Sequence, residues 1–454
     1  MAKAKKKESL TPEERLQAAL VPESEQPYKV PGNWIYFYFT SLIDIEGGTQ
    51  PPKSQFVTDC REGYIRLVQI RDFASDKYIV YVPDTVKLRH FNEDDILIAR
   101  YGASLGRICT GMRGVYNVAL AKTIFSPDIL NRKYVYWMLQ SESFQIPLMR
   151  ISRTAQAGFN KDDLSTFAMP LPPLAEQQRI VDRIESLFAK LDEVKQKAQD
   201  ALDSFETRKA AILHKAFTGE LTAQWRKEHG VGMESWETHE LVECFEIVSG
   251  IQKTPARTPR DNPIPYLAVA NVYRDKIDLS EIRYFEVTSE ELEKLKLQDK
   301  DILIVEGNGS GNEIGRCAMW HNELPLCIHQ NHIIRMRNKT ADVLPEYVLY
   351  YLNSQVGKSV MRERAKTTAG LFNLSAGKVK TIPLPFAPLD EETEIVRILD
   401  DLLAKEQQAK EAAEGVLEQI DLMKKAILAR AFRGELGTND PREESAVELL
   451  KAVV

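Results

Sequence analysis

Residues 171–194 read LPPLAEQQRIVDRIESLFAKLDEV, and residues 386–409 read FAPLDEETEIVRILDDLLAKEQQA. The two stretches align without a gap at an offset of 215 residues. The same offset aligns KAAILHKAFTGEL at 209–221 with KKAILARAFRGEL at 424–436. Self-similarity at a fixed spacing is the sequence signature of a repeated structural unit. The chain of 454 residues is therefore predicted to contain one such unit twice.

Both repeated stretches carry apolar residues at heptad spacing, which predicts two long helices of coiled-coil character. Prolines precede each stretch, and Gly219 and Gly434 follow, as expected at the starts and ends of helices. Two unrelated surface helices are the alternative, which the gapless repeat disfavours. The residues expected to pack the helices together are Val181, Ile184, Phe188, Leu191, Leu202, Phe205, Ile212, Val396, Leu399, Leu403, Leu417, Ile420 and Ile427.

The repetition continues upstream of each helix, with offsets that drift and so imply insertions in one copy. DILI at 95–98 corresponds to DILI at 301–304, and PLP at 170–172 corresponds to PLP at 383–385. Apolar, β-branched runs at 64–70, 79–82, 96–99, 302–305 and 332–336 predict strands. Runs at 134–139 and 345–352 predict helices. The expected fold is a tandem of two mixed α/β globular domains, each followed by a long helix.

Composition restricts the class of protein further. Apolar residues make up 43% and charged residues 28% of the chain, so each domain can bury a core. No apolar run is long enough to span a membrane, and the N-terminal MAKAKKKESL lacks the apolar core of a secretory signal. Five cysteines without a CxxC pair indicate a reducing cytosol. We expect a cytoplasmic protein with no membrane contact.

The charge is unevenly distributed along the chain. The net charge is −6, yet residues 331–380 carry +6 and residues 381–454 carry −7. A basic tract beside an acidic one is compatible with a DNA-facing module joined to a solvated helix, and equally with two ordinary surfaces. Charge alone therefore does not decide between these interpretations.

No catalytic motif stands out in the sequence. The glycine-rich stretch at 305–315 is neither GxGxxG nor a P-loop. DNPIPY at 261–266 resembles the Asn-Pro-Pro-Tyr element of adenine methyltransferases, but Ile264 interrupts it, so we interpret it as the entry to a strand. The cluster Cys317, His321, Cys327, His329 and His332 matches no zinc spacing. We expect no catalytic residue and no metal site.

Three polar segments recur in both halves and suit contacts with phosphates and base edges. The first comprises Thr49, Gln50 and Lys53, with Lys253, Thr254 and Arg257 in the second half. The second is a glycine-rich turn with Tyr101, Ser104 and Arg107, and with Asn308, Ser310 and Asn312. The third is a late loop with Arg153, Thr154, Gln156 and Asn160, and with Lys366, Thr367, Thr368 and Asn373. A plain loop explains any one segment, and the recurrence favours DNA binding.

From about residue 30 onward the chain resembles the specificity subunit of a type I restriction-modification system. The resemblance rests on LPPLAEQQRIV at 171–181 with its counterpart PLDEETEIV at 388–396, and on AFTGEL at 216–221 with AFRGEL at 431–436. The second copy departs from the first at Asp390 and Glu392, where the first has Ala175 and Gln177. This departure leaves the helix prediction intact.

The resemblance implies two target-recognition domains that each read half of a bipartite DNA site, with the helices packed as an antiparallel coiled coil that sets the unread spacer. It divides the chain into an N-terminal arm (1–29), domain 1 (30–170), spacer helix 1 (171–225), domain 2 (230–385), spacer helix 2 (386–437) and a C-terminal tail (438–454). The implied partners are double-stranded DNA, two methyltransferase subunits and restriction subunits.

The implied chain is not an enzyme. Adenine methylation, translocation and cleavage would belong to partner subunits, which would hold S-adenosylmethionine, ATP and magnesium, while this chain would hold no cofactor. Two rivals remain open. A repeat-built coiled-coil scaffold would bind no DNA in a sequence-dependent way, and an adenine methyltransferase acting alone would have to bind S-adenosylmethionine by itself.

Overall fold

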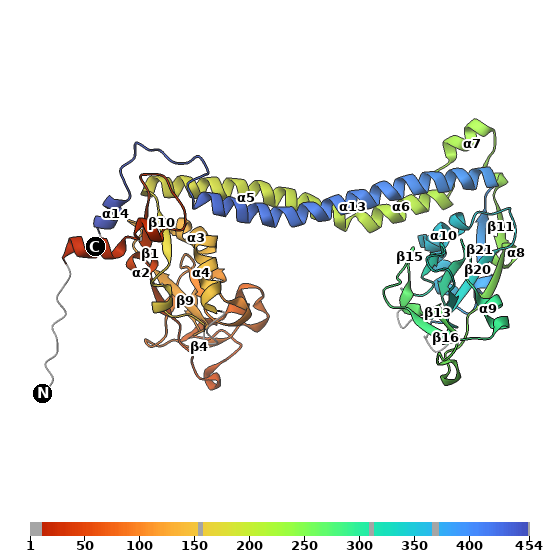
Figure 1. Ribbon diagram of the computed structural model, residues 1–454, viewed down its shortest axis with the longest axis horizontal. Coiled ribbons are helices and arrows are strands. Elements are labelled where there is room, and N and C mark those ends of the chain that lie inside the picture. The colour runs from red at the N-terminus through yellow and green to blue at the C-terminus, as the bar shows by residue number, and fades with distance from the viewer. Residues whose placement is uncertain (1–10, 153–157, 308–312, 366–371, 453–454) are drawn as a thin grey trace. The chain divides into compact units, whose positions relative to one another are not determined.

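The computed structural model describes residues 11–152, 158–307, 313–365 and 372–452 (Figure 1). Nine of the predicted DNA-contacting residues lie outside these ranges: Arg153, Thr154, Gln156, Asn308, Ser310, Asn312, Lys366, Thr367 and Thr368. The chain forms two compact units. Unit 1 comprises Met1–Ala198 and Gly415–Val454, and unit 2 comprises Gln199–Glu414.

Unit 1 is a mixed α/β unit built on two four-stranded sheets, of order β2-β9-β6-β7 and β4-β3-β8-β5, and a β1-β10 pair. Its strands are β1 (Ile35–Tyr38), β2 (Asp44–Gly47), β3 (Tyr64–Val68), β4 (Tyr81–Pro83), β5 (His90–Phe91), β6 (Leu97–Ala99), β7 (Ile108–Cys109), β8 (Gly114–Tyr116), β9 (Leu120–Ile124) and β10 (Ala168–Leu171). Its helices before the spacer are α1 (Pro12–Ala19), α2 (Phe39–Leu42), α3 (Arg132–Gln140) and α4 (Glu142–Ser152).

Unit 2 repeats this plan, with sheets of order β12-β20-β17-β18 and β16-β13-β19 and the pairs β11-β21 and β14-β15. Its strands are β11 (Glu237–Glu240), β12 (Phe245–Ser249), β13 (Pro263–Leu267), β14 (Val272–Tyr273), β15 (Lys276–Ile277), β16 (Arg283–Glu286), β17 (Ile302–Val305), β18 (Cys317–Met319), β19 (Ile328–His329), β20 (Ile333–Asn338) and β21 (Pro383–Phe386). Its shorter helices are α7 (Ala223–His229), α8 (Leu241–Cys244), α9 (Ser289–Leu295), α10 (Pro345–Asn353), α11 (Gln355–Ala365) and α12 (Ala376–Lys380).

The observed elements confirm the predicted repeat and its mixed α/β character. The runs expected as strands at 64–70, 96–99 and 302–305 contain β3, β6 and β17, and DNPIPY leads into β13. The predicted helices at 134–139 and 345–352 are the central parts of α3 and α10. Element ends differ by a few residues because caps define them. Helix α3, for example, begins after Asn131, whose side chain accepts hydrogen bonds from the backbone N–H groups of Lys133 and Tyr134.

The long helices belong to the cores of both units. In unit 1, Ile180, Val181 and Ile184 of α5 (Leu174–Asp203) are fully buried in one cluster with Leu428 of α13 (Leu389–Ala431) and Phe432 just beyond it. In unit 2, α6 (Phe205–Phe217) contributes Leu213 and Phe217 to the main cluster, and α13 contributes Ile395 and Leu399. Hydrophobic burial therefore joins each helix to a globular unit rather than to another helix alone.

The first repeated helix is not continuous, in contrast to the prediction of one helix over 171–225. It ends as α5 at Asp203, resumes as α6 after Ser204, and the chain then turns at Gly219 before the separate helix α7. The Ser204 hydroxyl donates to the carbonyls of Asp200 and Ala201, a local bond that competes with the helical pattern. Gln419 stands at the corresponding position of α13, which runs unbroken.

Within each unit the helices run antiparallel. In unit 1 the Lys424 ammonium pairs with Asp192 at 2.5 Å and lies 5.1 Å from the centre of the Phe188 ring. In unit 2 Arg208 pairs with Glu406 at 2.8 Å, and the Lys410 ammonium lies 5.0 Å from the Phe205 ring. Of the predicted packing residues, Val181, Ile184, Phe188, Phe205, Leu399 and Ile420 are buried, whereas Leu191, Leu202, Ile212, Val396, Leu403, Leu417 and Ile427 are half-buried.

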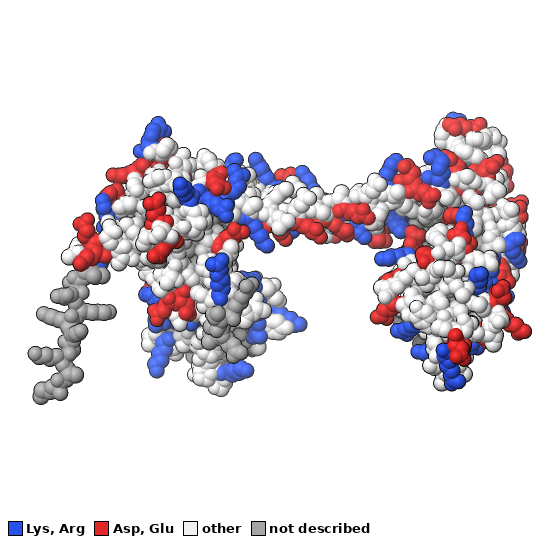
Figure 2. Space-filling view, viewed as in Figure 1, with Lys and Arg blue, Asp and Glu red and all other residues white. Residues whose placement is uncertain are grey.

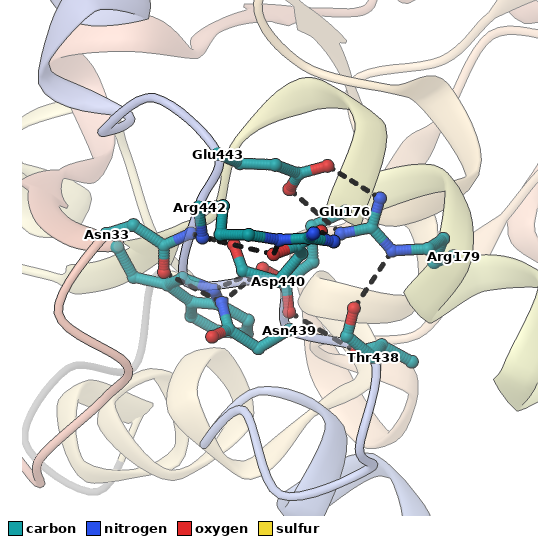
Figure 3. A network of polar contacts seen from close by, with 9 residues as sticks. Asn33, Glu176, Arg179, Thr438, Asn439, Asp440, Arg442 and Glu443 are labelled. Carbon is teal, nitrogen blue, oxygen red and sulfur yellow. Dashed lines mark hydrogen bonds and ion pairs between the residues drawn. The ribbon is translucent and has the colours of Figure 1, made fainter.

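The first and last helices that the structure describes pack onto unit 1. A capping box forms at the start of α1, where Thr11 accepts from the Glu14 backbone N–H. Short helix α14 (Val447–Lys451) buries Leu450 and packs against α1. The segment before α14 lies against the first turn of α5, where Asn439 donates to Glu176 at 2.7 Å and Arg179 forms a bidentate ion pair with Glu443 at 2.8 Å (Figure 3). The C-terminal segment is therefore a structural part of unit 1.

Candidate nucleic-acid interface

In unit 1 the three polar segments predicted from sequence are joined through Arg100, which directly follows β6. Its guanidinium donates two hydrogen bonds, of 3.2 and 3.0 Å, to the Phe159 carbonyl in the late loop. The same group lies 5.2 Å from the ring of Tyr101 in the glycine-rich turn. One of its nitrogens reaches Gly47, because a Cβ there would stand 2.9 Å away, and Gly47 leads directly into the Thr49–Lys53 turn. One side chain therefore holds together segments far apart in sequence.

The close approach of the late loop to this turn requires a glycine. Gly158 has a φ of +76°, and a Cβ there would stand 2.3 Å from the Arg100 carbonyl oxygen and 2.4 Å from the Tyr101 ring. Any side chain would push the late loop away from the glycine-rich turn. The geometry thus fixes Gly158 and Phe159 against the end of β6.

The predicted DNA-contacting residues of unit 1 that the structure describes differ in exposure and in hydrogen bonding. Gln50, Lys53, Tyr101 and Arg107 are exposed, and Thr49 and Ser104 are half-buried. The Arg107 guanidinium donates weakly to the Phe73 carbonyl at 3.4 Å. Asn160 is exposed, but its side-chain oxygen accepts from the backbone N–H groups of Asp162 and Asp163, so it caps the following turn. Asn160 therefore has a structural role whether or not it meets DNA.

The chain segment between β2 and β5 of unit 1 carries a surface of basic and aromatic side chains. Figure 2 shows Lys and Arg side chains along the edge of unit 1 on which Figure 1 draws β4. The exposed members are Lys53, Arg61, Arg71, Lys77, Lys87 and Arg89. Tyr78 is 47% exposed, with the Arg71 guanidinium 4.8 Å and the Lys77 ammonium 5.6 Å from its ring. Cations interleaved with aromatic rings are typical of surfaces that meet nucleic acid phosphates and bases.

In unit 2 the corresponding junction carries the opposite charge. Glu306 follows β17 as Arg100 follows β6, and its backbone carbonyl accepts from the Leu374 N–H at 2.7 Å. Its carboxylate lies 3.5 Å from the imidazole of His332, which is 55% exposed. Gly307 and Asn373 form a bridge that attaches the end of the late loop to the end of β17. In unit 2 the described contacts therefore attach the late loop to the end of β17 with different side chains from those of unit 1.

Three of the predicted residues that the structure describes in unit 2 are exposed, and one is held in an ion pair. The exposed residues are Lys253, Thr254 and Asn373. Arg257 forms a bidentate ion pair with Glu291 of α9 at 2.8 and 3.0 Å, which lowers the pKa of Glu291 to about 2. A guanidinium held in this way orders the loop, and it would have to leave Glu291 to contact DNA.

Sequence reasoning missed Arg100 and Glu306. Both stand at the same place after a matched strand, so the repeat alignment contains the signal. Their role depends on the late loop folding back onto β6 or β17, and neither periodicity nor composition predicts that long-range contact. The difference in charge between the two positions is the feature that distinguishes the two units at this junction.

Within the ranges that the structure describes, no group of three His, Cys, Asp or Glu side chains could hold a metal ion. Three of the cysteines there are poor nucleophiles, because burial raises the pKa of Cys109 to about 11 and of Cys317 and Cys327 to about 12. Burial also lowers the pKa of His329 to about 4, so its ring is neutral. None of the described helices is long and apolar enough to cross a bilayer.

Comparison with known proteins identifies similar chains along nearly the whole length. Residues 31–203 and 233–415 match the type I restriction modification DNA specificity domain. The chain is 27% identical over 446 residues to the EcoKI specificity subunit of Escherichia coli K12, covering 90% of both, and 23% identical over 435 residues to the StySPI specificity subunit of Salmonella potsdam, again covering 90% of both.

Solved structures share the fold at lower identity. A chain from a structure on complex assembly and conformational transition of the type I R-M system superposes with a TM-score of 0.65 at 18% identity, covering 90% of this chain and all of that one. The HsdS subunit of Thermoanaerobacter tengcongensis gives a TM-score of 0.61 at 18% identity, covering 91% of this chain and all of that one.

Proposed function

We infer the function from one premise: this chain belongs to the type I restriction modification DNA specificity family, whose domain matches each of its two units. The chain is a DNA specificity subunit, and the scaffold alternative has no support among its relatives. The observation that carries the inference is the repeated junction at the end of a matched strand, where Arg100 in unit 1 and Glu306 in unit 2 each hold the late loop.

We propose that each unit reads one half of a bipartite site in double-stranded DNA. Backbone phosphates would meet the basic surface around Tyr78, and base edges would meet the segments joined at Arg100 and Glu306. Arginine suits guanine and glutamate suits the amino group of cytosine, so unlike junctions favour unlike half-sites. The spacer helices would set the number of unread base pairs between the half-sites, since α13 is one helix with residues in both units.

The proposal also names partner subunits, and it assigns the catalytic steps to them rather than to this chain. We propose that two methyltransferase subunits and the restriction subunits assemble on it in the cytoplasm. Those subunits would bind S-adenosylmethionine, ATP and magnesium, while this chain supplies recognition alone. The resemblance to a chain from a type I R-M complex supports the assembly in general terms.

The direct test is a map of methylated adenines in host DNA with and without this gene. Loss of a single two-part motif with a gap of fixed length is expected. An unchanged map, with the neighbouring methyltransferase shown to be expressed, would overturn the proposal in favour of a scaffold.

A further inference from the structure

Unit 2 contains a cavity of about 250 Å³ where α6, the β14–β15 hairpin and the start of α11 meet. Three cationic side chains line it from three different elements: Lys209 from α6, Arg274 from the hairpin and Lys358 from α11. Two acidic side chains, Glu206 and Asp275, are also in the lining. The lining therefore carries one more positive than negative charge.

The walls of this cavity are held by hydrogen bonds, one of which is made by the Arg274 guanidinium. Asn353 and Cys317 bond to each other twice, at 3.3 and 3.4 Å. Asp275 adopts a φ of 59°, and its backbone N–H donates to the Cys317 carbonyl at 2.9 Å. The Arg274 guanidinium donates to the Ile314 carbonyl at 3.2 Å. The cations are thus attached to a fixed frame rather than to a free loop.

Bringing these cations together in a partly buried place lowers the stability of the folded chain. Burial lowers the pKa of Lys358, the neighbouring charges of Arg274 and Lys209 lower it further, and the Glu206 carboxylate opposes this by raising it. Burial lowers the pKa of Arg274 as well. Of the three cations, Lys209 lies 3.6 Å from the Asp275 carboxylate. A bound anion would relieve the repulsion and replace lost hydration.

The first repeat places different charges at the corresponding position. Lys358 corresponds to Gln145 of unit 1, whose amide donates to the carbonyls of Gly106 and Leu139. The cavity beside Gln145 is lined by the charged side chains of Glu142, Arg150 and Lys425 and by apolar side chains. Lys209 corresponds to Lys424, which pairs with Asp192 instead. Both repeats thus have a cavity at this place, and the lysine at position 358 distinguishes the cavity of unit 2.

We propose that this cavity in unit 2 binds a phosphate group. Its volume admits a tetrahedral oxyanion together with ordered water. An arginine fork together with two lysine point charges from other directions suits the oxygens of a phosphate. The group is either a free phosphate or a phosphate of a nucleic acid backbone, and only the second source rests on the proposed function.

The first experiment titrates the full-length chain with inorganic phosphate by calorimetry, at ionic strength matched with chloride. One phosphate per chain is expected to bind. Lys358→Gln introduces the residue that unit 1 has at this place, so the variant is expected to fold. It should weaken phosphate binding about tenfold, which is the effect of losing one charge-assisted hydrogen bond. Lys276→Gln removes the same charge from an exposed position of the same hairpin and should leave binding unchanged.

The second experiment measures the salt dependence of DNA binding by the assembled complex containing each variant. If the source is the DNA backbone, Lys358→Gln lowers the slope of log K against log salt by about one while leaving sequence preference intact. If the source is free phosphate, the slope stays unchanged and only the calorimetric loss is seen.

Two results would overturn the proposal. One is the absence of any effect of Lys358→Gln in either experiment. The other is an equal loss with Lys276→Gln, which would indicate general screening rather than a site. Failure of the complex to bind any specific DNA would count against the proposed function. The phosphate titration would still test whether the cavity binds phosphate.

Discussion

At the scale of single residues, two buried carboxylates organise the starts of the repeated helices. Glu176 accepts from the Trp34 indole at 2.8 Å, and Glu391 accepts from the Trp236 indole at 2.9 Å. In unit 1 the further donors are the neutral side chains of Thr438 and Asn439. In unit 2 Glu391 also bonds to the buried Arg226. The two units therefore use the same acid at the same place with different electrostatics.

Glu391→Gln should destabilise unit 2 by about 3 kcal/mol, because it leaves the buried Arg226 charge without its partner. The matched control Glu176→Gln should cost unit 1 about 1 kcal/mol, since it loses only hydrogen bonds to neutral donors. Hydrogen exchange of β11 and β1 measures the two effects separately. Equal losses in the two units would contradict the argument.

Glu392 makes unit 2 sensitive to pH. Burial raises its pKa from 4.5 to about 8, and its Oε1 has no hydrogen-bond partner. Between these two pH values the folded state binds more protons than the unfolded state, so the free energy of unfolding falls as pH rises. Gln177 occupies the same place in unit 1 and donates to the carbonyls of Ile129 and Pro172.

Glu392→Gln should therefore stabilise unit 2 by about 1 to 3 kcal/mol at pH 8.5, and by less at pH 5, because it removes a buried charge that is only partly satisfied, by the Leu344 backbone N–H. Hydrogen exchange of β21 in variant and parent, compared at each pH, measures the difference. The reciprocal Gln177→Glu should impose the same pH dependence on unit 1. A gain independent of pH would show that the charge is not responsible.

The sequence predicts the positions of these buried carboxylates only in part. The repeat places Glu176 and Glu391 in the first turn of their helices, two residues after the apolar Leu174 and Leu389. The structure exposes those leucines by 37% and 40% and buries the carboxylates. The reason is that the first helical turn packs on a globular unit, and the donors to Glu176 lie 142 to 263 residues away in sequence. Local periodicity contains no information on such partners.

At the scale of elements, the spacer helices follow their heptad pattern where helix faces helix. Phe188 shows how α5 is fixed in unit 1: its ring lies 5.1 Å from that of Trp137 on α3 and beneath the ammonium of Lys424 on α13. Three helices therefore meet on one aromatic ring. The break between α5 and α6 escaped prediction because the serine that causes it is common in ordinary helices as well.

Phe188→Ala should destabilise the packing of α13 on unit 1 by about 3 kcal/mol, since it removes a buried ring and leaves a cavity. Hydrogen exchange should accelerate in residues 415–431 of α13. Val194→Ala on the same helix is a control, because Val194 is 46% exposed and should change exchange little. Similar acceleration in both variants would count against a central role for Phe188.

At the scale of the whole chain, the first and last helices that the structure describes meet on unit 1, where α1 packs against α14. The sequence indicates only a tail at residues 438–454, because the anchors of this segment, Glu176 and Arg179, are remote in sequence. When the first and last segments of a chain lie together, the chain can be joined there and opened at another point. The order of its two halves in the sequence is then reversed. The linker between α7 and β11 is the natural place to open it, since Gly230 ends α7 with a φ of 68°.

A circular permutant that joins the ends by a short flexible linker and begins at Val231 should fold and recognise the same two-part DNA motif as the parent. Methylation of host DNA in the presence of the partner subunits measures this. A control opened inside β6, which is fully buried, should fail to fold. Loss of the motif in the first permutant, with folding intact, would show that the order of the halves matters.

The joining of residues 415–454 to unit 1 also decides the order in which a ribosome can complete the two units. Unit 2 is continuous from Gln199 to Glu414, so every residue of it has been synthesised before the last part of unit 1. Unit 1 must wait for Leu428, Ala431 and Phe432, which belong to its core. Although domains usually fold from the N-terminus onward during translation, here the half that is synthesised first is the half that is finished last.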